Sequence, residues 1–587
     1  MSKNNPYKKD SKEPSRLGQW LATGICGNDI LSSTFYVSGI ASVYVGVFAP
    51  VVLAVIGIVL FFYKAVYTEV VEALPTNGGA YNCLLNATSK NLAALAGTTT
   101  ILSYIATSVI SGQSAVYYLS SIVNIPIIPL TILLLLFFAI LIIMGIRDSA
   151  KVAFGIFSFH VITLTAFVLI GIWYSFTHVS YLQANLHASI PLIDRLGGIS
   201  KALFFGFAAS LLGVSGFESS ANFVEEQQKG VFRKTLRNML FFVVIFNPLI
   251  ALLALNVLPF STIVKDQDFL LSNTARMIGS SVFQYWVVID AFAVLAGAVL
   301  TGFVGVSGLI YRMTTDGCFP EFLAKVNKKG SYPYIVILFF ILCVSILLIT
   351  NGDLLSLAGV YTIAFLSVMS MFALGNLIMR VTRKDLKRTY HAPLLFVVIA
   401  FISTVAGIIG NIILNPKNLD YFISYFIPAI VLVFAILNLD FILIILDKIT
   451  THFKKMNSFI KRNFQDLTSG EFVVFIHHID RMYKILDYIS KNEIGREIYF
   501  IHCNNGEKKL YDLNFKKLQS VLPELNRAGA FTDFNAHYIY KNKPFGPKLI
   551  DEISKELKIR KNRILIGSIH NEHVFDYEEL GGARIIF

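Results

Sequence analysis

The chain has 587 residues, of which 55% are hydrophobic and only 15% are charged. Soluble globular chains carry about 25% charged residues, so this composition excludes an ordinary soluble protein and indicates a chain that crosses a membrane several times. The net charge of +13 could indicate nucleic-acid binding, but its distribution along the chain favours a topological role beside anionic lipid, with no nucleic-acid partner.

The first 16 residues are polar and basic and are expected to form a cytoplasmic tail, and residues 17–450 form the predicted membrane domain. About twelve apolar stretches are long enough to cross about 30 Å of hydrocarbon. They lie at 17–43, 47–73, 92–122, 125–147, 152–177, 200–226, 236–259, 279–311, 332–350, 353–381, 392–414 and 419–449.

Lys and Arg occur in alternate loops between these stretches, for example at 229–237, 312–329 and 380–388, whereas the loop at 350–354 has none. Positive residues are retained on the cytoplasmic side of membrane proteins. The pattern therefore predicts a multi-pass protein of the cell (inner) membrane with both termini in the cytoplasm.

Two of the predicted spans are interrupted by glycine and polar residues. The first contains CGNDILSST with Gly27, and the sixth contains GVSGFESS with Gly216. Interrupted helices at corresponding positions of two halves are typical of inverted-repeat transporters, whose binding site lies near the middle of the membrane. The alternative is that these glycines only allow close helix packing.

Both interruptions carry a carboxylate, Asp29 in the first span and Glu218 in the sixth. A charge at the centre of a membrane helix costs roughly 2.5–3.5 kcal/mol, so such residues are usually retained for function. Tyr36 shares a helical face with Asp29, and one face of the third span carries Tyr104, Thr107 and Ser111. Ser215 lies beside Gly216, three residues before Glu218. The alternative for Thr107 and Ser111 is a hydrogen bond to the preceding turn of their own helix. Carboxylate and hydroxyl oxygens suit a hard cation, and a buried carboxylate can also carry a proton.

Other ionisable residues within predicted spans have competing interpretations. Asp290 is a candidate second coupling residue or a helix-packing group, and His160 is interpreted as a packing histidine. Lys64 and Glu69, near the cytoplasmic end of the second span, are interpreted as a snorkelling or gate ion pair. The five cysteines show no metal-ligand spacing, and no nucleophile–base arrangement appears, so neither an enzyme nor a cofactor is predicted.

The motif LPTNGGAYNCLL at 74–85 and the sixth-span stretch SGFESSANFVEEQQKG resemble the amino acid–polyamine–organocation superfamily. This resemblance covers roughly residues 16–450. It implies an all-α membrane domain of the LeuT type, with five helices repeated in inverted orientation, and a secondary transport activity.

The first span departs from the glycine-rich stretch of amino-acid permeases. Its sequence CGNDILSSTFY is similar to the potassium–proton symporters of the KUP group, especially the KimA type. The resemblance implies potassium-associated roles for Asp29, Tyr36, Tyr104, Thr107, Ser111, Ser215 and Glu218. A tenth-span tyrosine of that group is not matched, because Tyr361 lies three positions after the equivalent residue, Ala358.

The composition changes near residue 450. Residues 451–469 read as a basic connector, and residues 470–587 alternate short β-rich runs with helical stretches, which predicts a small cytoplasmic α/β domain with a mainly parallel sheet. This tail resembles the universal-stress-protein domain. His570 stands where that family has a second phosphate-loop glycine, so homodimerisation or regulation is favoured over nucleotide binding.

Three hypotheses for function follow. The leading one is import of potassium together with protons across the bilayer. The second is a proton-coupled amino-acid or amine permease. The third, of another class, is a transporter-like sensor that signals through the tail.

Overall fold

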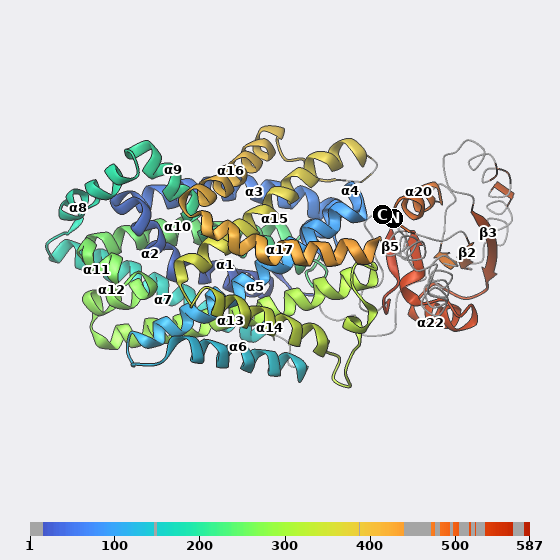
Figure 1. Cartoon of the computed structure of the whole chain (residues 1–587), viewed down its shortest axis with the longest axis horizontal. Helices are drawn as coiled ribbons and strands as arrows, with labels where there is room; N and C mark the ends of the chain where they lie inside the picture. The colour runs from blue at the N-terminus through green and yellow to red at the C-terminus, as the bar shows by residue number, and fades with distance from the viewer. Residues whose placement is uncertain are drawn as a thin grey trace, which may run out of the picture.

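The computed structural model divides into a long helical membrane part and a small α/β tail at one end of it (Figure 1). The described residues are 16–145, 150–384, 386, 388–438, 471–475, 482–493, 497–503, 516–517, 520, 523, 534–567 and 580–586. The predicted connector at 451–469 and His570 lie outside these residues.

The membrane part consists of α-helices joined by short turns. These are α1 (Gln19–Ser32), α2 (Thr34–Val45), α3 (Ala49–Ala73), α4 (Gly79–Ala87), α5 (Lys90–Ser120), α6 (Ile127–Ile143), α7 (Ala150–Thr177), α8 (Leu182–Arg195), α9 (Ile199–Ser210), α10 (Phe232–Val257), α11 (Phe260–Lys265), α12 (Leu270–Gly279), α13 (Ser281–Thr315), α14 (Pro333–Ile349), α15 (Leu354–Thr382), α16 (Leu394–Leu414) and α17 (Pro416–Leu437).

Among the described residues, nine helical runs are long and apolar enough to cross a membrane, and α6 and α14 are shorter apolar helices. One of the nine runs extends over 55 residues, from Gln19 to Ala73. At about 1.5 Å per residue it would be far longer than the membrane is thick, and Gly46 at φ 55° interrupts it. A multi-pass membrane protein is thus confirmed, while the count of twelve spans stays a prediction.

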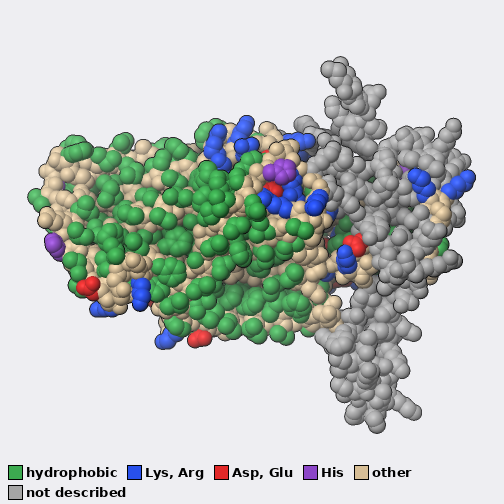
Figure 2. Space-filling view, turned by 90° about the horizontal axis from the view of Figure 1, so that it is seen from above, with side chains coloured by type: hydrophobic (Ala, Val, Ile, Leu, Met, Phe, Trp, Pro, Cys, Tyr) green, Lys and Arg blue, Asp and Glu red, His purple; other side chains and the backbone are tan. Residues whose placement is uncertain are grey.

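Hydrophobic side chains cover most of the membrane part on the face seen in Figure 2, and charged side chains gather toward its two ends. Helices α5 and α15 lie inside the bundle and are almost wholly buried, whereas α16 and α17 expose large apolar side chains. Helix α5 packs closely on α13, where Gly302 and Gly305 leave room for Ser108 and Tyr104. Small residues let membrane helices approach closely, which explains the Gly, Ser and Thr content of α5.

The predicted interruption at Gly216 is present, whereas the predicted interruption at Gly27 is wrong. The chain remains helical through Gly27 and turns at Ser33, between α1 and α2. Gly27 instead allows close packing, because a Cβ there would lie 2.5 Å from the ring of Phe157. In the sixth span α9 ends at Ser210, and two short 3₁₀ helices, η2 (Leu211–Val214) and η3 (Glu218–Asn222), flank Gly216.

The tail contains one five-stranded sheet in the order β3-β2-β1-β4-β5, and all its neighbouring strands are parallel. This confirms the parallel sheet expected from the sequence. Its elements are β1 (Glu471–Phe475), α20 (Met482–Asn492), β2 (Glu497–Cys503), β3 (Asn535–Lys541), α22 (Pro547–Glu556), β4 (Ile564–Gly567) and β5 (Arg584–Ile586). The last strand was not expected from the sequence.

Candidate functional site

The interruption of the sixth span lies directly against the first span. Gly216 has φ 89°, and a Cβ at this position would lie 2.7 Å from the backbone nitrogen of Ile30 and 2.9 Å from Cγ of Asp29. Only glycine combines this left-handed conformation with so close an approach. The fold therefore brings Asp29 and the irregular backbone around Gly216 together.

Asp29 is buried in α1 and accepts a hydrogen bond from a residue of the sixth span. Its side chain belongs to a residue that is only 4% exposed, and Ser219 Oγ donates to its Oδ2 at 2.5 Å. The same hydroxyl is 2.7 Å from the carbonyl oxygen of Gly216. Ser219 therefore ties the carboxylate of the first span to the interruption in the sixth.

Glu218 is also buried, and it folds back onto the interruption that precedes it. The backbone N–H of Gly216 donates to Glu218 Oε2 at 3.0 Å, and the Ser103 side chain of α5 lies near enough to act on this carboxylate. Asp29 is near enough for its charge to act on Glu218. The two carboxylates predicted from the sequence thus share one buried region.

Two of the predicted tyrosines reach the same region. Tyr36 Oη and Ser215 Oγ lie 3.4 Å apart, and both residues are almost fully buried. Tyr104 Oη accepts a hydrogen bond from the side-chain amide of Asn222. We call Asp29, Tyr36, Tyr104, Ser215 and Glu218 the buried oxygen site.

Thr107 and Ser111 are less closely connected to it. Thr107 Oγ1 donates to the carbonyl oxygen of Ser103 at 2.8 Å, which is the ordinary bond of a threonine to its own helix. Ser111 is buried, and its hydroxyl lacks a hydrogen-bond partner among the described residues. Both lie on the buried side of α5, but no described contact joins them to Asp29 or Glu218.

Several residues of this region were not selected from the sequence, among them Ser103, Ser219, Asn222 and Tyr361. Tyr361 of α15 is buried and lies near enough to Ser215, Asp29 and Glu218 to interact with them. Comparison of the sequence with the KUP group had placed Ala358, three residues before Tyr361, at the position of that group's tenth-span tyrosine. Because Tyr361 lies about one helical turn after Ala358, its side chain could have been recognised from the sequence as a candidate for the same region.

Asp290 lies apart from the buried oxygen site and pairs with His160. The two side chains are fully buried, and His160 Nδ1 lies 2.7 Å from Asp290 Oδ2. The other ring nitrogen is 3.4 Å from the carbonyl oxygen of Leu31, close to the turn in the first span. Because one nitrogen faces a carboxylate, His160 is an ion-pair or hydrogen-bond partner and not only a packing residue.

The predicted ion pair between Lys64 and Glu69 does not form. The Glu69 carboxylate is fully buried and binds Arg380 and Arg388 instead, with Arg388 Nη1 at 3.2 Å. The backbone N–H of Ala392 also donates to it at 2.9 Å. Residues in the last turn of the tenth span and directly after it thus neutralise Glu69, which sequence spacing within one helix could not reveal.

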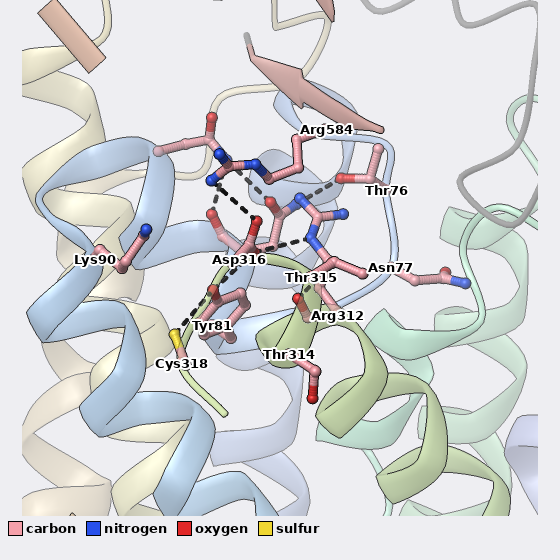
Figure 3. Close-up of polar contacts among 12 residues, drawn as sticks. Thr76, Asn77, Tyr81, Lys90, Arg312, Thr314, Thr315, Asp316, Cys318 and Arg584 are labelled. Atoms are coloured by element: carbon pink, nitrogen blue, oxygen red, sulfur yellow. Dashed lines mark hydrogen bonds and ion pairs between the residues drawn. The ribbon is translucent and has the colours of Figure 1, made fainter. Parts of the chain in front are cut away.

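A second polar cluster joins the tail to the membrane part (Figure 3). Arg584 of β5 pairs with Glu493, which follows α20, at 2.5 Å, and lies 4.0 Å from Asp316 at the end of α13. Lys90, the first residue of α5, binds Glu493 at 2.6 Å. Figure 3 shows Arg584 reaching from the tail toward Asp316, which also accepts a hydrogen bond from Tyr81 at 2.7 Å.

Glu493 and Arg584 of this cluster lie outside the membrane spans, and each stabilises the charged form of the other. Burial alone would raise the pKa of the Glu493 carboxyl group, but Arg584 and Lys90 hold that pKa below its ordinary value. The Arg584 pKa is raised despite burial, because Glu493 stabilises its charged form. Paired in this way, both groups stay ionised although they are buried.

The chemistry available to the buried oxygen site is cation and proton binding. Carboxylate, phenol and hydroxyl oxygens can replace the hydration shell of a hard cation, and two neighbouring carboxylates can share a proton. The backbone N–H of Gly216 is already bound by Glu218 and is therefore not free for an anionic substrate group. An anionic group would also meet the charge of Asp29.

Comparison with known proteins gives both amino-acid and potassium transporters. The branched-chain amino acid permease BcaP of Bacillus subtilis (strain 168) is 22% identical over 64% of this chain and 81% of its own length. The potassium transporter KimA of the same organism is 22% identical over 58% of this chain and 58% of its length. The b(0,+)-type amino acid transporter 1 of Rattus norvegicus is 26% identical over 42% of this chain and 50% of its length.

The family described as amino acid permease matches residues 17–437, which include the whole described membrane part except residues 16 and 438. Its relatives are membrane transporters with different substrates. The chain therefore belongs to the amino acid permease family, within the amino acid–polyamine–organocation superfamily, and is a multi-pass membrane transporter and not an enzyme.

Proposed function

We propose that this protein is a secondary transporter that imports potassium together with protons. The observation that carries the proposal is the position of Glu218, whose carboxylate binds the backbone N–H of Gly216 within the buried oxygen site. The protein thus supplies its own carboxylate where a substrate carboxylate would otherwise bind. What remains for a substrate is a set of oxygen atoms with a negative charge at Asp29, which favours a cation.

The proposed roles of the two carboxylates differ. Asp29 offsets the hydration energy that a potassium ion gives up, and the oxygens of Tyr36, Tyr104 and Ser215 complete its surroundings. Thr107 and Ser111 are proposed to line the path of the ion along α5. Glu218 carries the coupled proton, since a second negative charge beside Asp29 is costly.

The test is uptake of rubidium, as a potassium analogue, by purified protein in liposomes, with an amino-acid mixture assayed in parallel. Asp29→Asn keeps the side-chain volume and removes the charge, so rubidium uptake should fall to background while the protein remains folded. Asp420→Asn, at an exposed position of α17, is the matched control and should leave uptake unchanged. Undiminished rubidium uptake by Asp29→Asn would refute the proposal.

A second candidate is a proton-coupled amino-acid permease. The family match and the 81% of the BcaP sequence that aligns with this chain favour it. In that case the wild-type protein would take up amino acids and not rubidium. Asp29→Asn would then be tolerated, because removal of the charge would lower the repulsion of the substrate carboxylate.

Both termini are proposed to lie in the cytoplasm, and the tail with them. A membrane-impermeant maleimide applied to intact cells should label His178→Cys, an exposed position after α7, and should not label Lys543→Cys in the tail. Labelling of Lys543→Cys from outside would refute this orientation.

A further inference from the structure

Helix α10 changes from basic to apolar along one exposed face. Arg233 and Arg237 are exposed near its beginning, and Phe241 and Val244 follow with 59% and 41% of their surface exposed. The spacings of four, four and three residues place all four side chains on one side of the helix. In a membrane protein such a face is turned toward lipid.

The neighbouring helix α3 also carries exposed apolar side chains next to a basic one, at the same level along the membrane part. Ile58 and Phe61 are exposed, and Lys64 follows them one turn later. A Cβ on Gly57 would lie 2.8 Å from Val244 Cγ2, so residues 57 and 244 are level with each other.

The two helices run in opposite directions, because the beginning of α3 and the end of α10 both lie beside α8. There Ser189 bonds the backbone N–H of Val47, and Asn185 bonds the carbonyl oxygen of Leu255. Seven residues from Gly57 along α3 and seven back from Val244 along α10 lead to Lys64 and Arg237. These two cations are therefore level, about 10 Å nearer the tail than the contact between Gly57 and Val244.

The three cations are close together and are not neutralised by the protein. Arg233 and Arg237 both act electrostatically on Lys64, and no carboxylate is among the groups that do. Within the described part of the chain, none of the three forms an ion pair. Their described contacts are with aromatic rings, Arg233 at 5.0 Å from the ring centre of Tyr390 and Lys64 at 5.9 Å from that of Phe61.

Glu69, five residues beyond Lys64 on α3, does not neutralise them, because it is fully buried and held by Arg380 and Arg388. Three neighbouring cations without counter-charge repel one another, which destabilises the protein unless an anion is bound. Arginine and lysine groups of this kind bind phosphate oxygens, and arginine can do so with two parallel hydrogen bonds.

We propose that Lys64, Arg233 and Arg237 form a binding site for the phosphate headgroup of an anionic phospholipid, with its acyl chains lying along Ile58, Phe61, Phe241 and Val244. We call the three cations the basic lipid-facing patch. Free phosphate would use only the cations, whereas a phospholipid also covers the exposed apolar surface immediately beside them. Basic pockets between membrane helices at the cytoplasmic boundary have the chemistry that recognises such headgroups.

The experiment measures lipid retention and not transport, so its result is independent of the substrate proposed above. Purified, delipidated protein is titrated with phosphatidylglycerol or phosphatidylcholine of identical acyl chains, and bound lipid is counted by native mass spectrometry. Wild type should bind phosphatidylglycerol at least about tenfold more tightly, since each basic residue near the headgroup contributes about 1 kcal/mol. The variant Lys64→Gln/Arg233→Gln/Arg237→Gln should lose this preference.

The matched control is Lys325→Gln/Lys328→Gln/Lys329→Gln, which removes three exposed charges from the loop after α13. It should keep the preference. If the triple variant at the patch does not fold, Arg237→Gln alone should still weaken phosphatidylglycerol binding. The proposal would be overturned if the wild type bound the two lipids equally, or if the control variant lost the preference for phosphatidylglycerol as completely as the patch variant. It would also be overturned if excess inorganic phosphate displaced all bound phosphatidylglycerol.

Discussion

The carboxylates of Asp29 and Glu218 have different hydrogen-bond partners in one buried region. Asp29 is held by the hydroxyl of Ser219, whereas Glu218 is held by the backbone N–H of Gly216. A residue that binds the irregular backbone itself is well placed to change partners when that backbone moves. This distinguishes the residue proposed to bind the proton from the one proposed to bind the cation.

Glu218→Gln should therefore flatten the pH dependence of rubidium uptake, because the amide cannot take up or release a proton over the assayed range. The measurement is initial uptake in liposomes across a series of external pH values, with Asp290→Asn assayed beside it. A reduced rate with an unchanged pH profile would contradict the assignment. It would indicate the buried pair of His160 and Asp290 as the coupling group instead.

Asp268, in the short 3₁₀ turn η4 (Gln267–Phe269) outside the membrane spans, gives a prediction for stability. Burial, together with the negative charge of Asp353, raises the pKa of its carboxyl group to about 6. Because the pKa of Asp268 is raised in the folded protein, ionisation of this carboxyl group destabilises the fold. The protein therefore keeps its full stability below about pH 4 and loses part of it as the pH rises through about 6.

Asp268→Asn should therefore raise the free energy of unfolding by about 2–3 kcal/mol at pH 8 and change it little at pH 4. Thermal unfolding in one detergent at both pH values measures this, with Asp420→Asn as the exposed control. A gain of equal size at both pH values would show that the carboxylate charge is not its cause.

At the scale of elements, the site depends on two helices that stop being regular at adjacent points. The turn at Ser33 separates α1 from α2, and Gly216 separates η2 from η3. Backbone groups released from helical bonding are costly in lipid and are tolerated where protein or substrate satisfies them. Here Glu218 satisfies the N–H of Gly216, and the Ser219 hydroxyl lies between the Gly216 carbonyl and Asp29, which couples the shape of the sixth span to the first.

Gly216→Ala should abolish transport and lower stability, since the added Cβ would meet the backbone of Ile30 at 2.7 Å in a left-handed conformation that costs about 1–2 kcal/mol. Gly297→Ala in α13 is the control, because its Cβ would have no neighbour within 4 Å. Rubidium uptake and thermal unfolding are measured for both. Wild-type behaviour of Gly216→Ala would mean that the close approach is not needed.

At the scale of the whole molecule, the tail is held to the membrane part by a buried ion-pair cluster. Lys90 begins α5, which carries Ser103 and Tyr104 farther along, and Asp316 ends α13, which packs on α5. Deletion of residues 451–587 is expected to leave a folded transport domain with altered regulation or self-association. Loss of all membrane insertion on deletion would show that the tail is structural.

Glu493→Gln should release the tail, because Lys90 and Arg584 would face each other without their shared counter-charge. Removing one partner of a buried ion pair costs about 3–5 kcal/mol. Since the Glu493 pKa is lowered in the folded protein, docking in the wild type should be complete above about pH 4.5 and weaken as the pH falls below that value. Hydrogen exchange of β5 at pH 7 and pH 4 measures both effects.

The control for this experiment is Asp487→Asn, which removes an exposed partner of Lys491 from the same helix, α20. It should leave exchange in β5 unchanged. Protection of β5 in Glu493→Gln equal to that of the wild type would contradict the proposed role of the cluster.

The sequence by itself determined the features that depend on local composition. Apolar runs identified the membrane domain, and alternation of β-rich and helical stretches identified the parallel α/β tail, because burial in lipid or in a sheet selects residue type along the chain. Carboxylates beside glycines in two spans identified Asp29, Glu218 and Gly216, since charge within a membrane helix is rarely accidental.

Only the tertiary structure decided which groups meet across helices. It placed the first interruption at Ser33 instead of Gly27, brought Tyr361 to Ser215, and paired Glu69 with Arg380 instead of Lys64. It also joined Arg584 at the end of the chain to Glu493, Asp316 and, through Glu493, to Lys90. Such contacts depend on the angle and register of packed helices, and spacing within one helix carries no information about either.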